Sequence, residues 1–564
     1  MIKNRRIADK RRLMFWFNGG PGCSSFDGLM MEVGPWRMDG KDSFKVTEGG
    51  WEEYMTMVYV DQPAGTGFSY TSTDRYVHTL AEASTQFLEF LRNFYQVFPE
   101  YKDVDTYLGG ESFAGQWIPV FADAMLNSSF PIHGVAIGNG WIDPRRQYPS
   151  YLDFSVKVGL VEENSDAWKE AKKVTDKCMA ELDNIKDREP MQVKGCESIL
   201  LDVVKSQEKE VDDKDMCLNI YDVRFFDTKP DCGMNWPPDI HNITTFLGRK
   251  DVVKALHADA HPGSWIECRS GIHTAFRELT ENASVTVIPR VLAKIPVLIF
   301  AGDQDLICNY VGLESMIKEM TWNGATGLGT VQTQSWSVNA TPAGTWVASR
   351  NLTYAKIFNA SHMAPYDLPH VTHDMILRFM DFNFSSIFEG SAKIPSSLGN
   401  VKKPVFVGEE EAKPSTPPVS GKTPEQDKAM WEGTLVSILS LRSLIIVVAY
   451  YNAGSAALVL ILIFAGIGIF VWCRFRRPRT VKLAGNEEES IPLNASRRME
   501  DEVDDEAAVE EARSQFSDGD GISWQGRGKG KGKERAIERE VHEPPIFDMG
   551  DSDAEDDRMR MQRD

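Results

Sequence analysis

The chain lacks several features that would assign it to common protein classes. Acidic residues outnumber basic ones by 82 to 62, so the formal net charge of −20 argues against nucleic acid as a partner. No internal repeat is apparent, and the cysteines show neither a CxxC pair nor a Cys/His spacing typical of metal sites. The glycine-rich loop Asp61–Tyr70 has no lysine in P-loop spacing, which favours a packing turn over a phosphate site. We therefore expect no metal and no cofactor.

The first residues also lack the apolar core of a signal peptide, because Met1 to Arg12 is short and basic. Yet seven possible N-glycosylation sequons precede residue 400, and their number favours a lumenal domain. These sequons begin at Asn127, Asn242, Asn282, Asn339, Asn351, Asn359 and Asn383.

One short stretch has the layout of a nucleophile elbow. The strand-like run Thr106–Leu108 enters a glycine pair, then Ser112, then small residues from which a helix begins. Such a turn lifts a hydroxyl clear of the backbone at a helix N-terminus, where free N–H groups can meet an oxyanion. The G-x-S-x-G pattern is imperfect, since Ala114 stands at the second glycine position and Gly115 follows it. The alternative is an ordinary glycine-rich turn.

A serine nucleophile needs a base and a group that orients the base, and the chain has only ten histidines. The apolar run Ile295–Ala301 predicts a buried strand followed by Asp305, and Leu352–Phe358 predicts a strand followed by His362. The order Ser, Asp, His is that of α/β-hydrolases. Alternatively, Asp305 caps a helix and His362 is an ordinary loop histidine. We also expect strands at Leu13–Phe17, Met55–Val60 and Val135–Ile137, and a helix at Ala81–Phe98.

Four segments together resemble the signature segments of serine carboxypeptidases, a family with the α/β-hydrolase fold, over roughly residues 5–385. The segments are Trp16–Ser25, Gly110–Gly115, Gly302–Asn309 and His362–Pro365. The resemblance makes Ser112 the nucleophile, Asp305 the orienter and His362 the base. It assigns oxyanion N–H groups to Gly20 and to Phe113, where the family usually has tyrosine.

The same resemblance assigns binding of the substrate's terminal carboxylate to Asn18, Glu32 and Glu111, with Trp16 alongside. Acidic side chains can hold a carboxylate only when protonated, because two carboxylates repel each other. Glu111 adjoins Ser112 in the sequence and so must lie near the site. Affinity for a free C-terminus should therefore fall as pH rises.

The lumenal catalytic domain is expected to span residues 1–390, with a helical cap inserted at about 149–241. Because the resembled family has further strands and a signal peptide before the first signature segment, we expect the start to be truncated. The cap cysteines are disulfide candidates. The resemblance suggests Cys23 with Cys268 and two pairs within the cap, leaving Cys308 either as a reactive thiol or as a buried inert one. The cap cysteines are Cys178, Cys196, Cys217 and Cys232.

After residue 390 the chain changes character. Residues 391–434 have the composition of a linker, and residues 453–473 are apolar and long enough to span a membrane. Arginines follow the span at once, which predicts a single-pass type I topology with a cytosolic tail at residues 474–564. That tail is acidic and disordered by composition. The apolar segment 435–452 contains Arg442, and we interpret it as lying beside the membrane or as sequence retained by an imperfect gene model.

This architecture resembles the membrane-anchored, pheromone-processing carboxypeptidases of the fungal Golgi and trans-Golgi network. Those enzymes trim C-terminal Lys and Arg from kexin-cleaved peptide precursors, and the resemblance also suggests a link to programmed cell death. The sequence does not indicate an oligomeric state. Two alternatives remain open: an acyltransferase on the same fold and triad, or a non-catalytic membrane protein that uses the fold for binding.

Overall fold

A computed structural model describes residues 1–276 and 281–404. The predicted ambiguous segment 435–452, span 453–473 and tail 474–564 lie outside these residues, as does most of the linker 391–434. Within the described residues, no helix is both long and apolar enough to cross a membrane.

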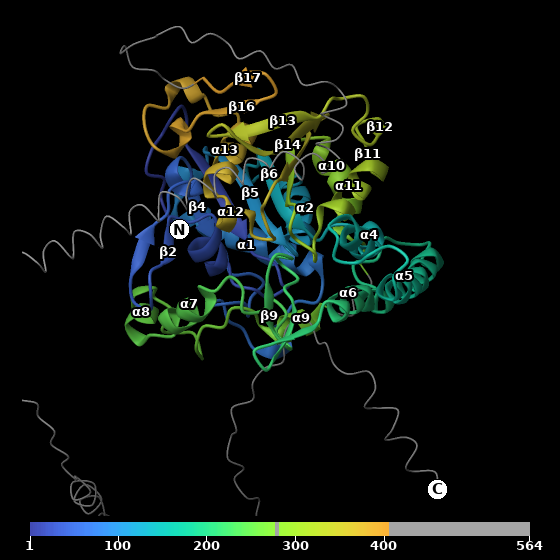
Figure 1. Cartoon of the computed structure of the whole chain (residues 1–564). Coiled ribbons are helices and arrows are strands. Elements are labelled where there is room, and N and C mark those ends of the chain that lie inside the picture. Colours follow the sequence, from blue (N-terminus) through green and yellow to red (C-terminus); the bar gives the residue numbers. More distant parts are fainter. Residues whose placement is uncertain (277–280, 405–564) are drawn as a thin grey trace, which may run out of the picture. The chain divides into compact units, whose positions relative to one another are not determined.

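The described chain is built around a ten-stranded mixed sheet in the order β17-β16-β13-β14-β15-β10-β6-β5-β1-β4 (Figure 1). The strands from β15 to β4 are parallel, and β14, β13, β16 and β17 continue the sheet antiparallel. The parallel strands are β1 (Arg12–Phe17), β4 (Thr56–Tyr59), β5 (Asp105–Ser112), β6 (Gly134–Gly140), β10 (Val297–Gly302) and β15 (Leu352–Ile357). The antiparallel ones are β13 (Gln334–Val338), β14 (Thr341–Ser349), β16 (Ser396–Leu398) and β17 (Val401–Lys402).

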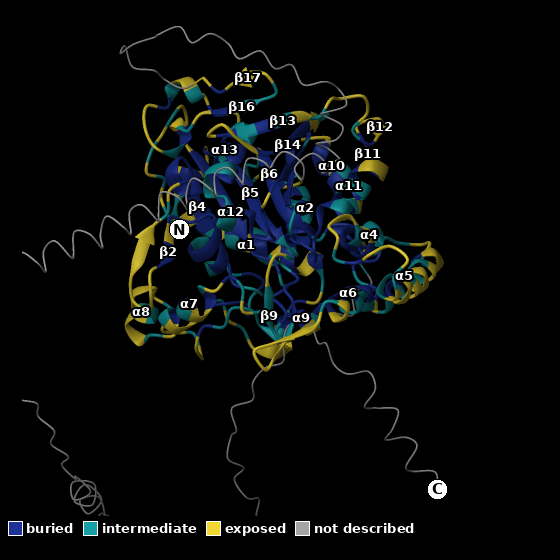
Figure 2. Ribbon diagram, viewed as in Figure 1, coloured by how far each residue is buried: buried dark blue, intermediate teal, exposed yellow. Residues whose placement is uncertain are grey.

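The central strands are mostly apolar because both faces of the sheet are covered. In β1, Phe15 and Phe17 face one core, while Met14 and Trp16 face the other. Helices α1 (Leu80–Val97) and α2 (Ala114–Leu126) contribute to the first core and α13 (Pro369–Phe379) to the second. In Figure 2 the central parallel strands are accordingly buried. The predicted strands and the predicted helix over 81–98 are confirmed, as is the α/β-hydrolase type of fold.

A long insertion separates β6 from β10. Its helices are α3 (Pro144–Gln147), α4 (Ser150–Lys157), α5 (Asp166–Asn184), α6 (Lys194–Ser206), α7 (Ile240–Leu247), α8 (Lys250–Ala255), α9 (Ser270–Ala275) and α10 (Ile288–Leu292). Its strands β7 (Lys209–Val211), β8 (Lys214–Leu218) and β9 (Phe226–Thr228) form a small sheet. The helices expected in residues 149–241 are present, and the same region also contains three strands. Figure 2 shows α5 exposed along its outer side, as expected for a peripheral helix.

The disulfides match the predicted pairing. Cys23 is joined to Cys268, and the cap cysteines form two pairs. The cap pairs are Cys178–Cys196 and Cys217–Cys232. Cys308 is free and buried.

The remaining hairpins and helices lie outside the ten-stranded sheet. They are the hairpins β2 (Trp36–Met38) with β3 (Phe44–Val46) and β11 (Thr321–Trp322) with β12 (Ala325–Thr326), and the helices α11 (Tyr310–Glu319) and α12 (Ala364–Asp367). At the β4 edge, the backbone of Ile2 exchanges two hydrogen bonds with Met57, of 2.8 and 2.9 Å.

Candidate active site

Ser112 ends β5 and lies directly before α2, in the sharp turn that the sequence predicts. Its φ of 61° lies in the left-handed region, which is costly for a residue with a side chain and marks the turn as strained. Gly19 approaches so closely that a Cβ there would lie 2.5 Å from Cβ of Ser112. The displaced second glycine also has a reason, since a Cβ on Gly115 would lie 2.6 Å from the carbonyl oxygen of Trp141.

Asp305 and His362 follow β10 and β15 and meet at the carboxyl edge of the sheet. Oδ2 of Asp305 lies 2.7 Å from Nδ1 of His362, and both side chains are buried. The same carboxylate accepts hydrogen bonds from the side chain of Asn139, at 2.8 Å, and from the backbone N–H of Ile307, at 3.0 Å. These donors hold Asp305 facing the imidazole. Sequence analysis assigned no role to Asn139, although its position at the end of a predicted strand was a signal.

The other nitrogen of His362 faces Glu111, since Nε2 lies 2.9 Å from Oε2 of that carboxyl group. Burial lowers the pKa of His362, but the charges of Asp305 and Glu111 outweigh burial and raise it to about 10. The backbone N–H of His362 donates to the backbone carbonyl of Tyr221 at 2.9 Å, and the centroids of the two side-chain rings lie 5.0 Å apart. The imidazole is thus contacted by Asp305, Glu111 and the Tyr221 ring.

Cys308 lies against the nucleophile, because its thiol is hydrogen-bonded to the side chain of Ser112. Burial raises the pKa of the thiol well above its usual range, followed by the charges of Asp305 and Glu111. A thiolate is therefore disfavoured, which supports the inert alternative for Cys308. Among the described residues, the ligand atoms of Asp305, Cys308 and His362 lie within 4.8 Å of one another. The bond between Asp305 and His362 accounts for that proximity without a metal ion.

The four residues predicted to bind a carboxylate form one buried network. The indole N–H of Trp16 donates to Oδ1 of Asn18 at 3.0 Å, which turns the Asn18 amide nitrogen toward two carboxyl groups. That nitrogen donates to Glu32 at 2.7 Å and to Glu111 at 3.0 Å. The backbone N–H of Gly19 also donates to Glu111, at 3.1 Å. The network lies beside Ser112 because Glu111 precedes it in β5.

Within this network, Glu32 is the acid whose pKa favours a bound proton. Burial, and after it the charge of Glu111, raises the pKa of Glu32 to about 8. The nearby cation Arg37 donates to the backbone carbonyls of Glu32, Gly34 and Trp36. A protonated Glu32 is a hydrogen-bond donor at neutral pH, which is what recognition of an anion requires.

Two further acids lie beside the network, and sequence analysis missed both. Asp27 precedes the π-helical turn η1 (Gly28–Glu32) and is 2% exposed. Burial raises its pKa well above the usual range, and the charges of Glu267, Glu32 and Glu111 contribute. Burial also raises the pKa of Glu267 to about 7. The sequence offered one indication for each acid: Asp27 lies close after the first signature segment, and Glu267 adjoins Cys268.

Gly20 and Phe113, the predicted oxyanion residues, line one pocket together with Ser112. The Phe113 ring packs edge-on against Trp117, with centroids 5.0 Å apart. Because Phe113 stands at the start of α2, its N–H belongs to the helix N-terminus, where free donors are expected.

Six of the seven sequon asparagines are exposed, and Asn242 is half-buried. The amide nitrogens of two of them are used in the fold, since Asn127 donates to Asp123 and Asn351 to Leu292.

Known proteins share both the sequence and the fold. The family model for serine carboxypeptidases matches residues 1–382. A pheromone-processing carboxypeptidase KEX1 of Coprinopsis cinerea is 61% identical over 99% of this chain and 85% of its own length. A protein of the same name from Cryptococcus gattii is 40% identical over 99% of this chain and 84% of its own.

Among solved structures, a prohormone-processing carboxypeptidase from Saccharomyces cerevisiae matches with a TM-score of 0.63 and 32% identity. The match covers 66% of this chain and 83% of that one. The chain therefore belongs to the serine carboxypeptidase family and is an enzyme of that class.

Proposed function

We propose that this enzyme removes single lysine or arginine residues from the C-termini of peptide precursors, using Ser112, Asp305 and His362 as its triad. The names of the relatives, pheromone-processing and prohormone-processing carboxypeptidases, support this substrate class. The observation that carries the specificity is the buried Asp27 beside the carboxylate-binding network.

The chemical step follows from the geometry around Ser112. Oγ of Ser112 attacks the carbonyl carbon of the last peptide bond and passes its proton to Nε2 of His362, while Asp305 stabilises the imidazolium. The N–H groups of Gly20 and Phe113 receive the oxyanion. When the C–N bond breaks, His362 gives the proton to the departing amine, and water then hydrolyses the acyl-enzyme to the shortened peptide. Before attack, the Ser112 hydroxyl must turn from Cys308 toward His362.

Substrate binding also prepares the base. A substrate carboxylate beside Asn18 and Glu32 disfavours a second negative charge on Glu111. The proton on Nε2 of His362 then passes to Oε2 of Glu111, the two heavy atoms being 2.9 Å apart. This single transfer makes His362 a neutral base. Peptides without a free C-terminus do not induce it, which favours exopeptidase over acyltransferase activity.

A substrate whose C-terminal carboxylate is bound by this network would place the side chain of its last residue near Asp27 and Glu267. Oδ1 of Asp27 has no hydrogen-bond partner among the described residues, although it is buried. Such an atom needs a donor, and an ammonium or guanidinium group supplies one. Glu267 lies near enough to Tyr221 that its charge, after burial, raises the pKa of that phenol. A terminal Lys or Arg would bring a cation close to these two acids, whereas Leu would leave Oδ1 of Asp27 without a partner.

The test uses full-length enzyme and peptides that differ only in the last residue, Lys, Arg or Leu. We expect Asp27→Asn to lower kcat/KM for the basic peptides by about 10- to 100-fold and to leave the Leu peptide unchanged or improved. Asp42→Asn is the matched control, because Asp42 is an exposed acid paired with Arg249. An unchanged Lys-to-Leu ratio in Asp27→Asn would overturn the assignment.

We further propose that the enzyme is a glycosylated, single-pass type I protein of the Golgi or trans-Golgi network membrane. The apolar residues 453–473, the arginines that follow them and the exposed sequons support this topology. Protease added to sealed microsomes should remove the tail at 474–564 and leave the glycosylated domain intact. A protected tail would instead indicate that 435–452 also spans the membrane.

A further inference from the structure

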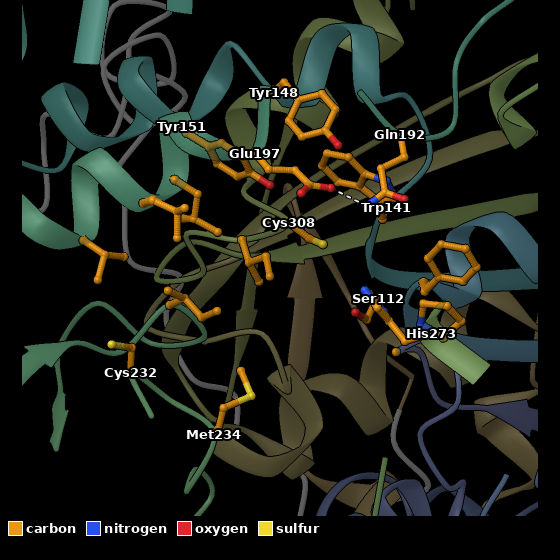
Figure 3. Close-up of a pocket in the computed structure, with 18 of the residues that line it drawn as sticks. Ser112, Trp141, Tyr148, Tyr151, Gln192, Glu197, Cys232, Met234, His273 and Cys308 are labelled. Atoms are coloured by element: carbon orange, nitrogen blue, oxygen red, sulfur yellow. Dashed lines mark hydrogen bonds between the residues drawn. The ribbon is translucent and has the colours of Figure 1, made fainter. Parts of the chain in front are cut away.

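Figure 3 shows the pocket that Gly20, Ser112 and Phe113 line together, and Asn18, Glu32 and Glu111 are not among its lining residues. Most of its wall comes from the insertion between β6 and β10, and most of the lining side chains are apolar or aromatic. Two lining residues, Glu197 and Asp231, are acids, and no lysine or arginine lines this pocket among the described residues. An acid facing an otherwise apolar pocket indicates a cationic ligand.

Glu197 is held in a fixed position. It lies in the first turn of α6, next to Cys196, whose disulfide with Cys178 joins α6 to α5. The side-chain amide of Gln192 donates a hydrogen bond to Oε1 of Glu197, drawn as a dashed line in Figure 3. None of the ion pairs between described residues includes Glu197. The helix N-terminus favours its negative charge.

Aromatic rings surround this carboxylate. The Trp141 centroid lies 4.9 Å from that of Tyr148 and 6.5 Å from that of Tyr151, and the two tyrosine centroids lie 6.2 Å apart. Burial raises the pKa of Tyr148, and the charge of Glu197 raises it further, as expected for a carboxylate close to that phenol. In Figure 3 these rings and Glu197 gather at one end of the pocket and Ser112 lies at the other. Ring faces and a carboxylate together suit an ammonium or guanidinium group.

The position of the pocket relative to Ser112 determines which substrate residue enters it. The carboxylate network holds the residue that leaves, on one side of the bond that breaks. None of the network residues lines this pocket, whereas the proposed oxyanion residues Gly20 and Phe113 do. It therefore receives the side chain of the penultimate residue, whose carbonyl Ser112 attacks.

We propose that Glu197, with Trp141, Tyr148 and Tyr151, binds a lysine or arginine at the penultimate position of the substrate. The inference rests on the proposed function, because it assumes cleavage at a free C-terminus. It makes the enzyme a reader of two adjacent basic residues rather than one. Asp231 is a weaker candidate, since its carboxylate already accepts a hydrogen bond from Asn235 at 2.8 Å.

Such a pocket orders the trimming of a dibasic end. On a precursor ending in Lys-Arg, both sites are filled and the arginine leaves quickly. The shortened peptide ends in Lys, and its penultimate residue now comes from the mature peptide. The second cut then depends on the terminal site alone and is slower, unless that residue is also basic.

The test uses full-length enzyme and four peptides that end in Lys-Arg, Leu-Arg, Lys-Leu and Leu-Leu. We expect kcat/KM for the Lys-Arg end to exceed that for the Leu-Arg end by about tenfold in the unaltered enzyme. Glu197→Gln should reduce this ratio to about one, with the ratio between terminal Arg and Leu unchanged. Glu181→Gln, an acid of α5 that does not line the pocket, is the matched control.

A charge reversal makes the assignment independent of any loss of folding. Glu197→Lys should process a peptide ending in Glu-Arg faster than one ending in Lys-Arg. If the unaltered enzyme prefers Leu-Arg, or if Asp231→Asn rather than Glu197→Gln removes the preference, the inference is wrong. If terminal Arg is not preferred over Leu at all, the proposed function fails instead.

Discussion

The two sides of Ser112 are built in different ways. On the side of the leaving residue, Trp16, Asn18 and Glu111 belong to β1, the loop after it and β5, and hydrogen bonds of 2.7 to 3.0 Å join their network. In the other region, Tyr148 and Glu197 belong to the insertion, and they help to line a pocket whose side chains are mostly apolar. In the proposed assignment, recognition of the C-terminus is thus part of the catalytic sheet, whereas recognition of the penultimate residue is added from outside it.

This difference has a consequence for how specificity can change. Any substitution in the Asn18 network also disturbs Glu111, which contacts His362 at 2.9 Å, so it affects catalysis on every substrate. A substitution in α6 alters one wall of a pocket and leaves the hydrogen bonds of His362 in place. The insertion side can therefore vary without loss of the chemistry.

The largest effect is expected where the two sides meet. Ser112→Ala should lower kcat by about 10⁴-fold or more for every peptide, whatever its last two residues. Asp305→Asn should retain more activity than His362→Ala, because the acid only orients and stabilises the imidazolium. Single-turnover measurements with the four peptides check this. Residual activity in Ser112→Ala that still depended on the end sequence would show that another group is the nucleophile.

The sequence could predict the side built on the sheet because its residues stand in or beside short motifs. Ser112, Asp305 and His362 each end a predicted strand, and parallel strands bring such ends to one edge. Asn18 and Glu111 followed from the family resemblance. Glu267 and Glu197 could not be found this way, since neither stands in a local motif: Glu267 is placed by the disulfide from Cys268 to the distant Cys23, and Glu197 by the disulfide that joins α6 to α5. Asn139 was missed because its contact with Asp305 joins residues far apart in the chain.

The two disulfides therefore offer a way to perturb each side separately. Replacing Cys178 and Cys196 with serine should loosen α6 and reduce the penultimate preference several-fold, with the terminal preference intact. Replacing Cys23 and Cys268 should do the reverse, because Cys268 adjoins Glu267. The first change is expected to cost about 3 kcal/mol of unfolding free energy, as for a loop of this length. Chemical denaturation and the four-peptide assay measure both effects, and equal losses on both sides would contradict the separation.

The smallest effect is expected from pH, and it should distinguish the two sides as well. The carboxylate network contains Glu32, whose pKa is raised to about 8 by burial and then by Glu111. Below pH 8, Glu32 is neutral and donates to the substrate carboxylate; above it, Glu32 ionises and repels that carboxylate. KM for free peptides should thus be level up to about pH 8 and then rise, by at most tenfold per pH unit for one proton. Penultimate selectivity should not change over this window.

The sequence-based expectation was a neutral Glu111 together with a neutral Glu32, and the raised pKa of Glu32 makes Glu32 the first of the two acids to test. Glu32→Gln keeps a neutral group that cannot ionise, so it should abolish the alkaline rise in KM, while peptide amides should show no rise even with the unaltered enzyme. The acidic limb has a separate origin, because His362 must lose its proton to act as a base. The charge of Glu111 contributes to the raised His362 pKa of about 10, so Glu111→Gln should shift the kcat limb toward lower pH. If Glu32→Gln left the alkaline rise in KM unchanged, the carboxylate would be recognised by another group, and the network on the sheet side would have only a structural role.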